Sequence, residues 1–213
     1  MTISEPTTVL TDGALALLAG YLAARLWRDG AGRRQAAPRL LAATFVTLAL
    51  GALLGAVSHG FVLQLGESAA AWVWRLTTWL VGATSFFLVV TATVATFAGA
   101  ARQLLVGAAG LKLVAYWVWM TGHDGFGWVV LDYGSAMLVT AAFMALAVRR
   151  RAPDGSGAAR WMLAAIAVSV GAAAVQLSGF SLHRNFNHND MYHLVQMVGL
   201  YLFYRAGLLL DDA

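Results

Sequence analysis

The sequence predicts an all-α integral membrane protein, a bundle of seven transmembrane helices that forms a single domain over residues 1–213. Hydrophobic residues make up 60% of the chain and charged residues only 11%, whereas soluble domains have about 25% charged residues. The apolar residues fall into seven runs, most of them about 20 residues or longer, which is the length that crosses the hydrocarbon core of a bilayer. The arginines cluster in alternate connections between these runs, as they do in membrane proteins.

The first three spans are predicted at residues 9–27, 40–65 and 69–97. No basic stretch precedes the first run, and its arginines follow it, so we interpret it as a true span and not as a cleaved signal peptide. Gly and Ala are frequent in the second run, which favours close helix packing. The third run is long enough to tilt or to protrude from the bilayer.

The other four spans are predicted at residues 101–120, 126–148, 158–180 and 190–210. Small residues are again dense in the runs 101–120 and 158–180, and tryptophans lie near many of the span ends, as in an aromatic belt. The last run differs from the others, because its first residues are polar and only the remainder is apolar.

The distribution of arginine predicts the orientation. The connections after the first, third and fifth spans are basic, and they contain these residues: Arg28, Arg33, Arg34, Arg39, Arg102, Arg149, Arg150, Arg151 and Arg160. The other connections carry almost no Lys or Arg. The positive-inside rule therefore places the N-terminus outside and the C-terminus in the cytoplasm, and the Ala- and Arg-rich composition suggests a bacterial inner membrane.

Composition excludes several kinds of site. The chain has no cysteine, so disulfides, thiolate metal sites and a cysteine nucleophile are ruled out, and any metal would be held by His, Asp, Glu or water. The net charge of +4 comes from topogenic arginine clusters and does not indicate nucleic acid. The expected partners are membrane lipid and a lipid or small-molecule substrate, and the oligomeric state stays open.

Polar side chains recur at one depth. Counting inward at about 1.5 Å per residue from the outer helix ends places six of them roughly 5–12 Å below the outer surface. They are His59, Arg75, Lys112, Asp132, Gln176 and His193. Such groups within membrane helices usually line a cavity or a functional site, so we expect a polar, outward-facing cavity. Lys112 and Asp132 have matched depth on consecutive helices and are expected to pair, while Arg75 is expected either to extend to the surface or to pair with an acid such as Glu67 or Asp190.

The histidines predict a zinc site between the second and seventh spans. Zn²⁺ is commonly held by three protein ligands with one open position, and the candidate ligands are His59, His188 and His193. His188 and His193 are five residues apart, about 140° around a helix, so both reach one ion only if His188 precedes the helix proper, with Asn187 or Asn189 as the N-cap. Asp190 shares a face with His193 and is a ligand, a partner of a ligand, a general base or simply an acid in the first helical turn.

Ser58-His59 on the second span and the sequence HNDMYH at the start of the seventh resemble the CREST superfamily of membrane hydrolases, which includes alkaline ceramidases and the progestin and adipoQ receptors. This resemblance implies a zinc ion held by His59 and His193, and hydrolysis of amide bonds in lipids. The family places a second histidine four residues before the last ligand, where this sequence has Asn189, with His188 adjacent to it.

The favoured function is therefore a zinc-dependent intramembrane hydrolase of a lipid-like amide or ester. In this hypothesis zinc lowers the pKa of a bound water, Asp190 or Glu67 accepts its proton, and Ser58 or Tyr192 stabilises the oxyanion. The alternative is a non-enzymatic seven-helix receptor or transporter whose histidines bind a ligand or relay protons. A haem carrier with His59 and His193 as axial ligands is a third possibility, and the absence of lysine from the last span argues against a retinal protein.

Overall fold

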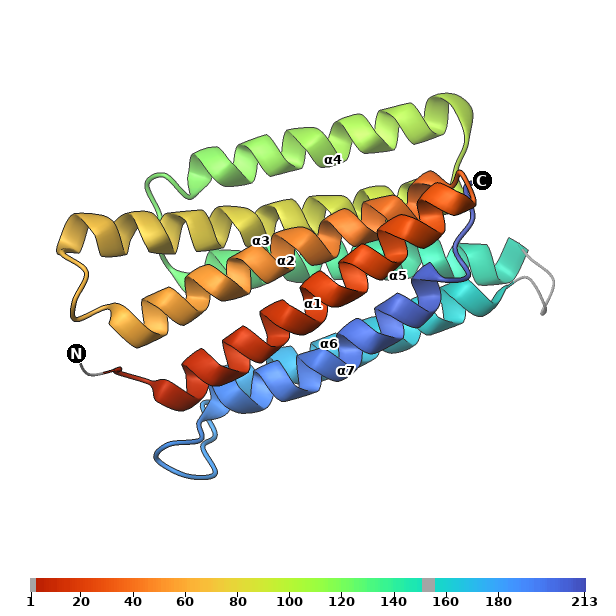
Figure 1. Ribbon diagram of the computed structural model, residues 1–213. Coiled ribbons are helices and arrows are strands. Elements are labelled where there is room, and N and C mark those ends of the chain that lie inside the picture. Colours follow the sequence, from red (N-terminus) through yellow and green to blue (C-terminus); the bar gives the residue numbers. More distant parts are fainter. Residues whose placement is uncertain (1–2, 151–155) are drawn as a thin grey trace.

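The computed structural model describes residues 3–150 and 156–213, and within these ranges the chain forms seven α-helices (Figure 1). Their bounds are α1 Pro6–Gly32, α2 Ala36–Phe61, α3 Glu67–Thr96, α4 Gly99–Trp119, α5 Phe126–Arg150, α6 Gly157–Ser178 and α7 His188–Gly207. Each predicted helix is confirmed. The largest differences are that α1 ends at Gly32, five residues after the predicted residue 27, that α2 begins at Ala36 instead of residue 40, and that α2 ends at Phe61 instead of residue 65. Arg151, one of the arginines used to orient the chain, lies outside the described residues.

Five of the described helices, α1, α2, α3, α5 and α6, are long and apolar enough to cross a membrane. Helices α4 and α7 are not among them. Helix α4 contains Arg102 and Lys112, and α7 contains Asp190, His193 and Arg205. All seven nevertheless run along the same bundle in Figure 1.

Six of the helices form a ring. Helix α1 packs against α2, α2 against α3, α3 against α5, α5 against α6, α6 against α7, and α7 returns to α1. Helix α4 lies outside this ring and packs against α3, as Figure 1 shows. The ring encloses an apolar core whose largest buried side chains include Phe45, Leu88, Met144, Met162 and Leu200.

The two ends of the bundle differ in chemistry. The N-terminus and the C-terminus lie at opposite ends (Figure 1). At the C-terminal end, Arg33 pairs with Asp29 and with Asp211 (Nη1–Oδ1 2.9 Å), and Asp212 accepts hydrogen bonds from the first amides of α2. Arg102 donates to the Ala213 carbonyl at 2.6 Å. The opposite end brings together the start of α1, the end of α2 and the start of α7, and it contains the three histidines predicted as ligands, His59, His188 and His193.

Candidate functional site

His193 lies at the centre of a buried polar cluster between α1, α2 and α7. Its Nε2 is 3.2 Å from Asp12 Oδ1, and its Nδ1 is 2.9 Å from the Thr11 hydroxyl. That hydroxyl is in turn 3.2 Å from Asp190 Oδ1. His193, Asp12 and Asp190 are 7%, 4% and 1% exposed, so water screens these contacts little.

Two tautomers of His193 fit these contacts, one in which Nε2–H donates to Asp12 and the Thr11 hydroxyl donates to Nδ1, and one with the proton on Nδ1. If the Thr11 hydroxyl donates to the Asp190 carboxylate, it accepts from Nδ1–H, and Nε2 then carries a lone pair. This lone pair faces the Asp12 Oδ1 atom at 3.2 Å. Two acceptors at this separation repel each other unless a proton or a cation lies between them.

The Asp12 carboxylate lies against α2. A Cβ atom built on Gly55 would stand 3.4 Å from Oδ2 and 3.5 Å from Oδ1 of Asp12, so the absence of a side chain at Gly55 leaves room for the carboxylate. Oδ2 is buried and has no hydrogen-bond partner among the described residues. A buried carboxylate oxygen without a partner is costly and usually marks a bound water, ion or ligand.

His59 lies one helical turn beyond Gly55, so both positions are on the face of α2 that meets Asp12. Its Nδ1 is 3.3 Å from Glu5 Oε1, and it is close enough to His193 for the two imidazoles to interact electrostatically. The carboxylate–imidazole contact fixes the ring and leaves Nε2 as the nitrogen available to another ligand. Carboxylates hold metal-binding histidines in this way.

Glu5 connects all three helices of the site. It is the N-cap residue of α1, pairs with His59 of α2, and accepts hydrogen bonds from Thr8 at 3.2 Å and from the Asn187 side chain at 3.4 Å. Burial by itself raises the pKa of the Glu5 carboxyl, but the hydrogen bonds with His59, Thr8 and Asn187 outweigh it and hold the pKa below its ordinary value. Glu5 therefore stays ionised at neutral pH.

Asp190 closes a capping box at the start of α7. The backbone N–H of Asn187 donates to Asp190 Oδ2 at 2.7 Å, and Asn187 is the N-cap residue. Since Oδ1 accepts from Thr11, both carboxylate oxygens are engaged. Asp190 thus fixes the start of α7 and orients Thr11 against His193.

His188 is the first residue of α7, so the helix includes both His188 and His193. The two side chains therefore leave α7 about 140° apart. The Nδ1 atom of His188 is buried without a partner among the described residues. Ser58 is partly buried on α2, but it points about 100° away from its neighbour His59.

The other polar side chains predicted at this depth form separate groups. Lys112 and Asp132 form the expected ion pair between α4 and α5. Arg75 extends to the surface, where it donates to the Thr121 carbonyl at 3.2 Å and stacks over Trp72, and it does not pair with Glu67 or Asp190. Gln176 donates to Asn189 at 2.6 Å. Of the six, only His59 and His193 share the α1–α2–α7 cluster.

Three residues of the site were not expected from the sequence, namely Glu5, Thr11 and Asp12. All three lie at the start of α1, which the pattern of apolar residues predicted to begin at residue 9. Asp12 could have been identified from the sequence, because an acid within an apolar run indicates a functional site just as the other buried polar groups do. Nothing local pointed to Glu5, whose role depends on contacts with α2 and α7.

Across residues 3–150 and 156–213, no three His, Asp or Glu side chains stand close enough together to hold a metal ion as they are now oriented. The donor chemistry still suits a divalent cation. Two ligands about 2.0–2.2 Å from a tetrahedral Zn²⁺ are about 3.3 Å apart, and His193 Nε2 and Asp12 Oδ1 are 3.2 Å apart. The free Nε2 of His59 is the third donor, and its ring would have to turn toward Asp12.

Comparison with known proteins identifies a family but no activity. Residues 7–212 match the model of a family described as "Family of unknown function (DUF6962)". No curated protein and no solved structure matches the chain.

Proposed function

The chain belongs to this family of unknown function, and we propose that it is a zinc-dependent membrane hydrolase of a lipid-like amide or ester. The observation that carries this proposal is the arrangement of the two imidazoles. Each is fixed through Nδ1 by an oxygen atom of α1, Thr11 for His193 and Glu5 for His59. The Nε2 atom of His193 then faces the Asp12 carboxylate, and that of His59 is free to turn toward it.

We assign Asp12, His59 and His193 as the protein ligands. Two histidines and one carboxylate form a common set for catalytic zinc, with a further position open to water or substrate. Asp12 takes the place that the sequence pattern suggested for His188, since the latter leaves α7 about 140° away from His193. Glu5 and the Thr11–Asp190 pair orient the two imidazoles.

The bound ion would supply Lewis acidity and an activated water at neutral pH. Asp12 Oδ2 is buried and unpaired, so it is placed to accept a proton. Asp190 acts as a positioning residue, because both of its oxygens are engaged. Ser58, next to His59 on α2, is the candidate donor to the developing oxyanion of the substrate carbonyl.

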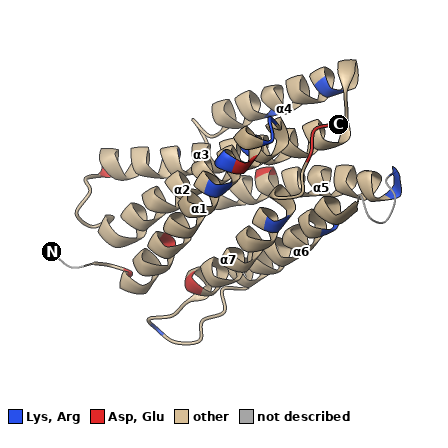
Figure 2. Cartoon of the chain, turned by 45° about the vertical axis from the view of Figure 1, so that its right-hand side comes forward, with Lys and Arg blue, Asp and Glu red and all other residues tan. Residues whose placement is uncertain are grey.

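The proposed membrane arrangement supports a lipid substrate. We infer that all seven helices cross a bacterial inner membrane with the N-terminus outside, because the arginines cluster at the connections on the side of the C-terminus. Figure 2 shows basic residues near the start of α4 and at the end of α5, on the side where the C-terminus lies. The site then lies within the outer leaflet, close to the ester and amide bonds of lipid head regions.

Metal content tests the proposal. The detergent-purified protein, prepared without chelator and equilibrated with zinc, is expected to retain about one zinc per chain by elemental mass spectrometry, as a three-ligand site would. Asp12→Asn, His59→Gln and His193→Gln should each lose it. His188→Gln and His123→Gln are the controls, since His123 is exposed and stacks on Trp119, and both should retain zinc. Hydrolysis of acyl-amide and acyl-ester substrates would then be assayed.

Two outcomes would contradict these assignments. Loss of zinc in His188→Gln, with retention in Asp12→Asn, would restore the ligand set suggested by the sequence. If the wild-type protein is folded but binds no zinc, the hydrolase proposal is wrong and the receptor or transporter function remains. That second function has its own support, because the contact between Asp12 and His193 can also hold a proton that is exchanged when a ligand binds.

A further inference from the structure

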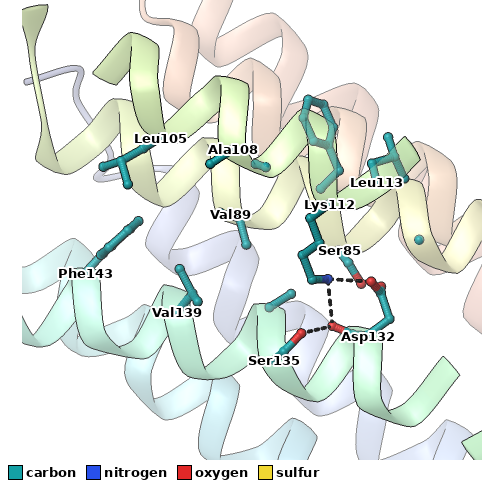
Figure 3. Close-up of a pocket in the computed structure, with 14 residues that line it drawn as sticks. Ser85, Val89, Leu105, Ala108, Lys112, Leu113, Asp132, Ser135, Val139 and Phe143 are labelled. Atoms are coloured by element: carbon teal, nitrogen blue, oxygen red, sulfur yellow. Dashed lines mark hydrogen bonds and ion pairs between the residues drawn. The ribbon is translucent and has the colours of Figure 1, made fainter. Parts of the chain in front are cut away.

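A cavity lies away from the histidine cluster, between α3, α4 and α5 (Figure 3). Its volume is about 470 Å³, within the range of about 300–1,000 Å³ typical of small-molecule sites. Apolar side chains, among them Val89, Val139 and Phe143, form most of the lining. The polar groups Ser85, Lys112 and Asp132 lie together at one end, as Figure 3 shows.

The polar end has unused hydrogen-bonding capacity. Lys112 forms an ion pair with Asp132 Oδ1 and donates to the Asp132 carbonyl at 3.2 Å, but Oδ2 of Asp132 has no partner among the described residues. The Ser85 hydroxyl is likewise unpaired. Asp132 is 7% exposed and Ser85 1% exposed. A buried polar group without a hydrogen-bond partner is destabilising, so a bound group that both donates and accepts would stabilise this end.

The charge at this end selects the ligand. Lys112 and Asp132 already neutralise each other, so an anionic head would leave an uncompensated charge next to Asp132 in an apolar site. A hydroxyl group can donate to Asp132 Oδ2 and accept from Ser85 while remaining uncharged.

The cavity opens sideways from the bundle. Helix α4 packs against α3 and is joined to α5 by the Lys112–Asp132 pair, and the lining residues Ala108 and Val139 are exposed, so the cavity is partly open between α4 and α5. In a membrane this opening faces the acyl chains.

The size of the cavity limits the ligand. At about 30 Å³ per non-hydrogen atom, the share of a water molecule in the liquid, the cavity holds on the order of 15 atoms. A diacyl phospholipid is several times larger.

We propose that this cavity binds a lipid with one hydrocarbon chain and an uncharged hydroxyl head, such as a long-chain alcohol or a monoacylglycerol. The hydroxyl lies between Ser85 and Asp132, and the chain runs along Val89, Val139 and Phe143 toward the opening between α4 and α5. This site is independent of the zinc proposal, because it shares no residue with the α1–α2–α7 cluster.

Photo-crosslinking tests the proposal on the purified full-length protein. The probe is a long-chain alcohol with a diazirine group in its chain, and labelled peptides are identified by mass spectrometry. We expect labelling of the cavity-lining segments of α4 and α5, and competition by monoolein but not by oleate or dioleoyl phosphatidylcholine. Ser85→Ala should weaken labelling about 3- to 10-fold through the loss of one hydrogen bond.

Matched substitutions distinguish specific labelling inside the cavity from labelling of the lipid-facing surface. Val139→Trp fills the cavity and should abolish specific labelling, whereas Leu138→Trp changes the adjacent residue, which is 75% exposed and does not line the cavity. Equal labelling of both variants, or of Ser85→Ala and wild type, would overturn the site. Stronger competition by oleate would overturn the uncharged head. Asp12→Asn should label like the wild type whether or not the protein binds zinc, so the two proposals fail separately.

Discussion

At the scale of single residues, the site depends on which nitrogen of each histidine is fixed. Both Nδ1 atoms contact an oxygen of α1, at 2.9 Å for His193 and 3.3 Å for His59. In the proposed zinc site, this shared pattern leaves Nε2 of each ring for the metal and gives Glu5, Thr11 and Asp190 the role of positioning residues.

Glu5→Gln tests this positioning role. The amide cannot stabilise the His59 ring as the carboxylate does, so zinc affinity is expected to fall about 10- to 100-fold, the usual effect of losing such a partner. The zinc affinity is measured by competition with a chelator of known affinity. The matched control is Glu67→Gln, an exposed acid in the first turn of α3, which should leave affinity unchanged. Equal affinities in all three proteins would show that Glu5 does not position His59 for zinc.

The sequence indicated part of this site. His59 and His193 stand out because ionisable groups are rare in apolar helices, and the capping pattern of Asn187 and Asp190 is local to α7. Glu5, Thr11 and Asp12 could not be placed, because helical periodicity describes one helix at a time. Which residues of α1 lie level with those of α2 and α7 depends on how the helices pack, and the sequence of one helix does not give it. The Lys112–Asp132 pair was predictable because the two helices are consecutive and the residues have equal depth.

At the scale of helices, α4 is the least integrated element. It lies outside the ring and is held to α3 by close contacts around Tyr116, whose hydroxyl donates to the Thr78 carbonyl at 3.2 Å. The Trp117 indole donates to the Trp79 carbonyl at 2.9 Å. Gly82 makes the close approach possible, because a Cβ atom there would lie 2.5 Å from the Tyr116 ring. The position of α4 therefore depends on the absence of a side chain on α3.

Gly82→Ala is expected to displace α4. Tyr116 is buried and cannot turn away freely, so the added methyl should cost about 1–3 kcal/mol, as overpacking does. The melting temperature should fall by roughly 2–10 °C, and amide exchange should increase in α4 more than in α1 and α2. Gly107→Ala in α4 is the control, because nothing lies within 4 Å of its Cβ position. Unchanged exchange in α4 of Gly82→Ala would contradict this account of its packing.

At the scale of the whole molecule, the proposed zinc site and the basic residues lie at opposite ends of the bundle. Glu5, Asp12, His59 and His193 lie at the end that holds the N-terminus. The opposite end contains Arg33, which pairs with Asp211, and Arg102, which donates to the last carbonyl of the chain. This polarity agrees with an orientation in which the basic end faces the cytoplasm.

The orientation can be tested without removing any residue, because the chain has no cysteine and a single introduced thiol is the only reactive one. Ser68→Cys and Ser181→Cys place exposed thiols at the end that we infer to be outside, and Ala100→Cys places one at the other end. In intact cells, a membrane-impermeant maleimide should label the first two and not the third. All three should react once the membrane is permeabilised, which shows that each thiol is accessible. Labelling of Ala100→Cys alone in intact cells would reverse the orientation and place the histidine site on the cytoplasmic side, where a lipid substrate would have to come from the inner leaflet.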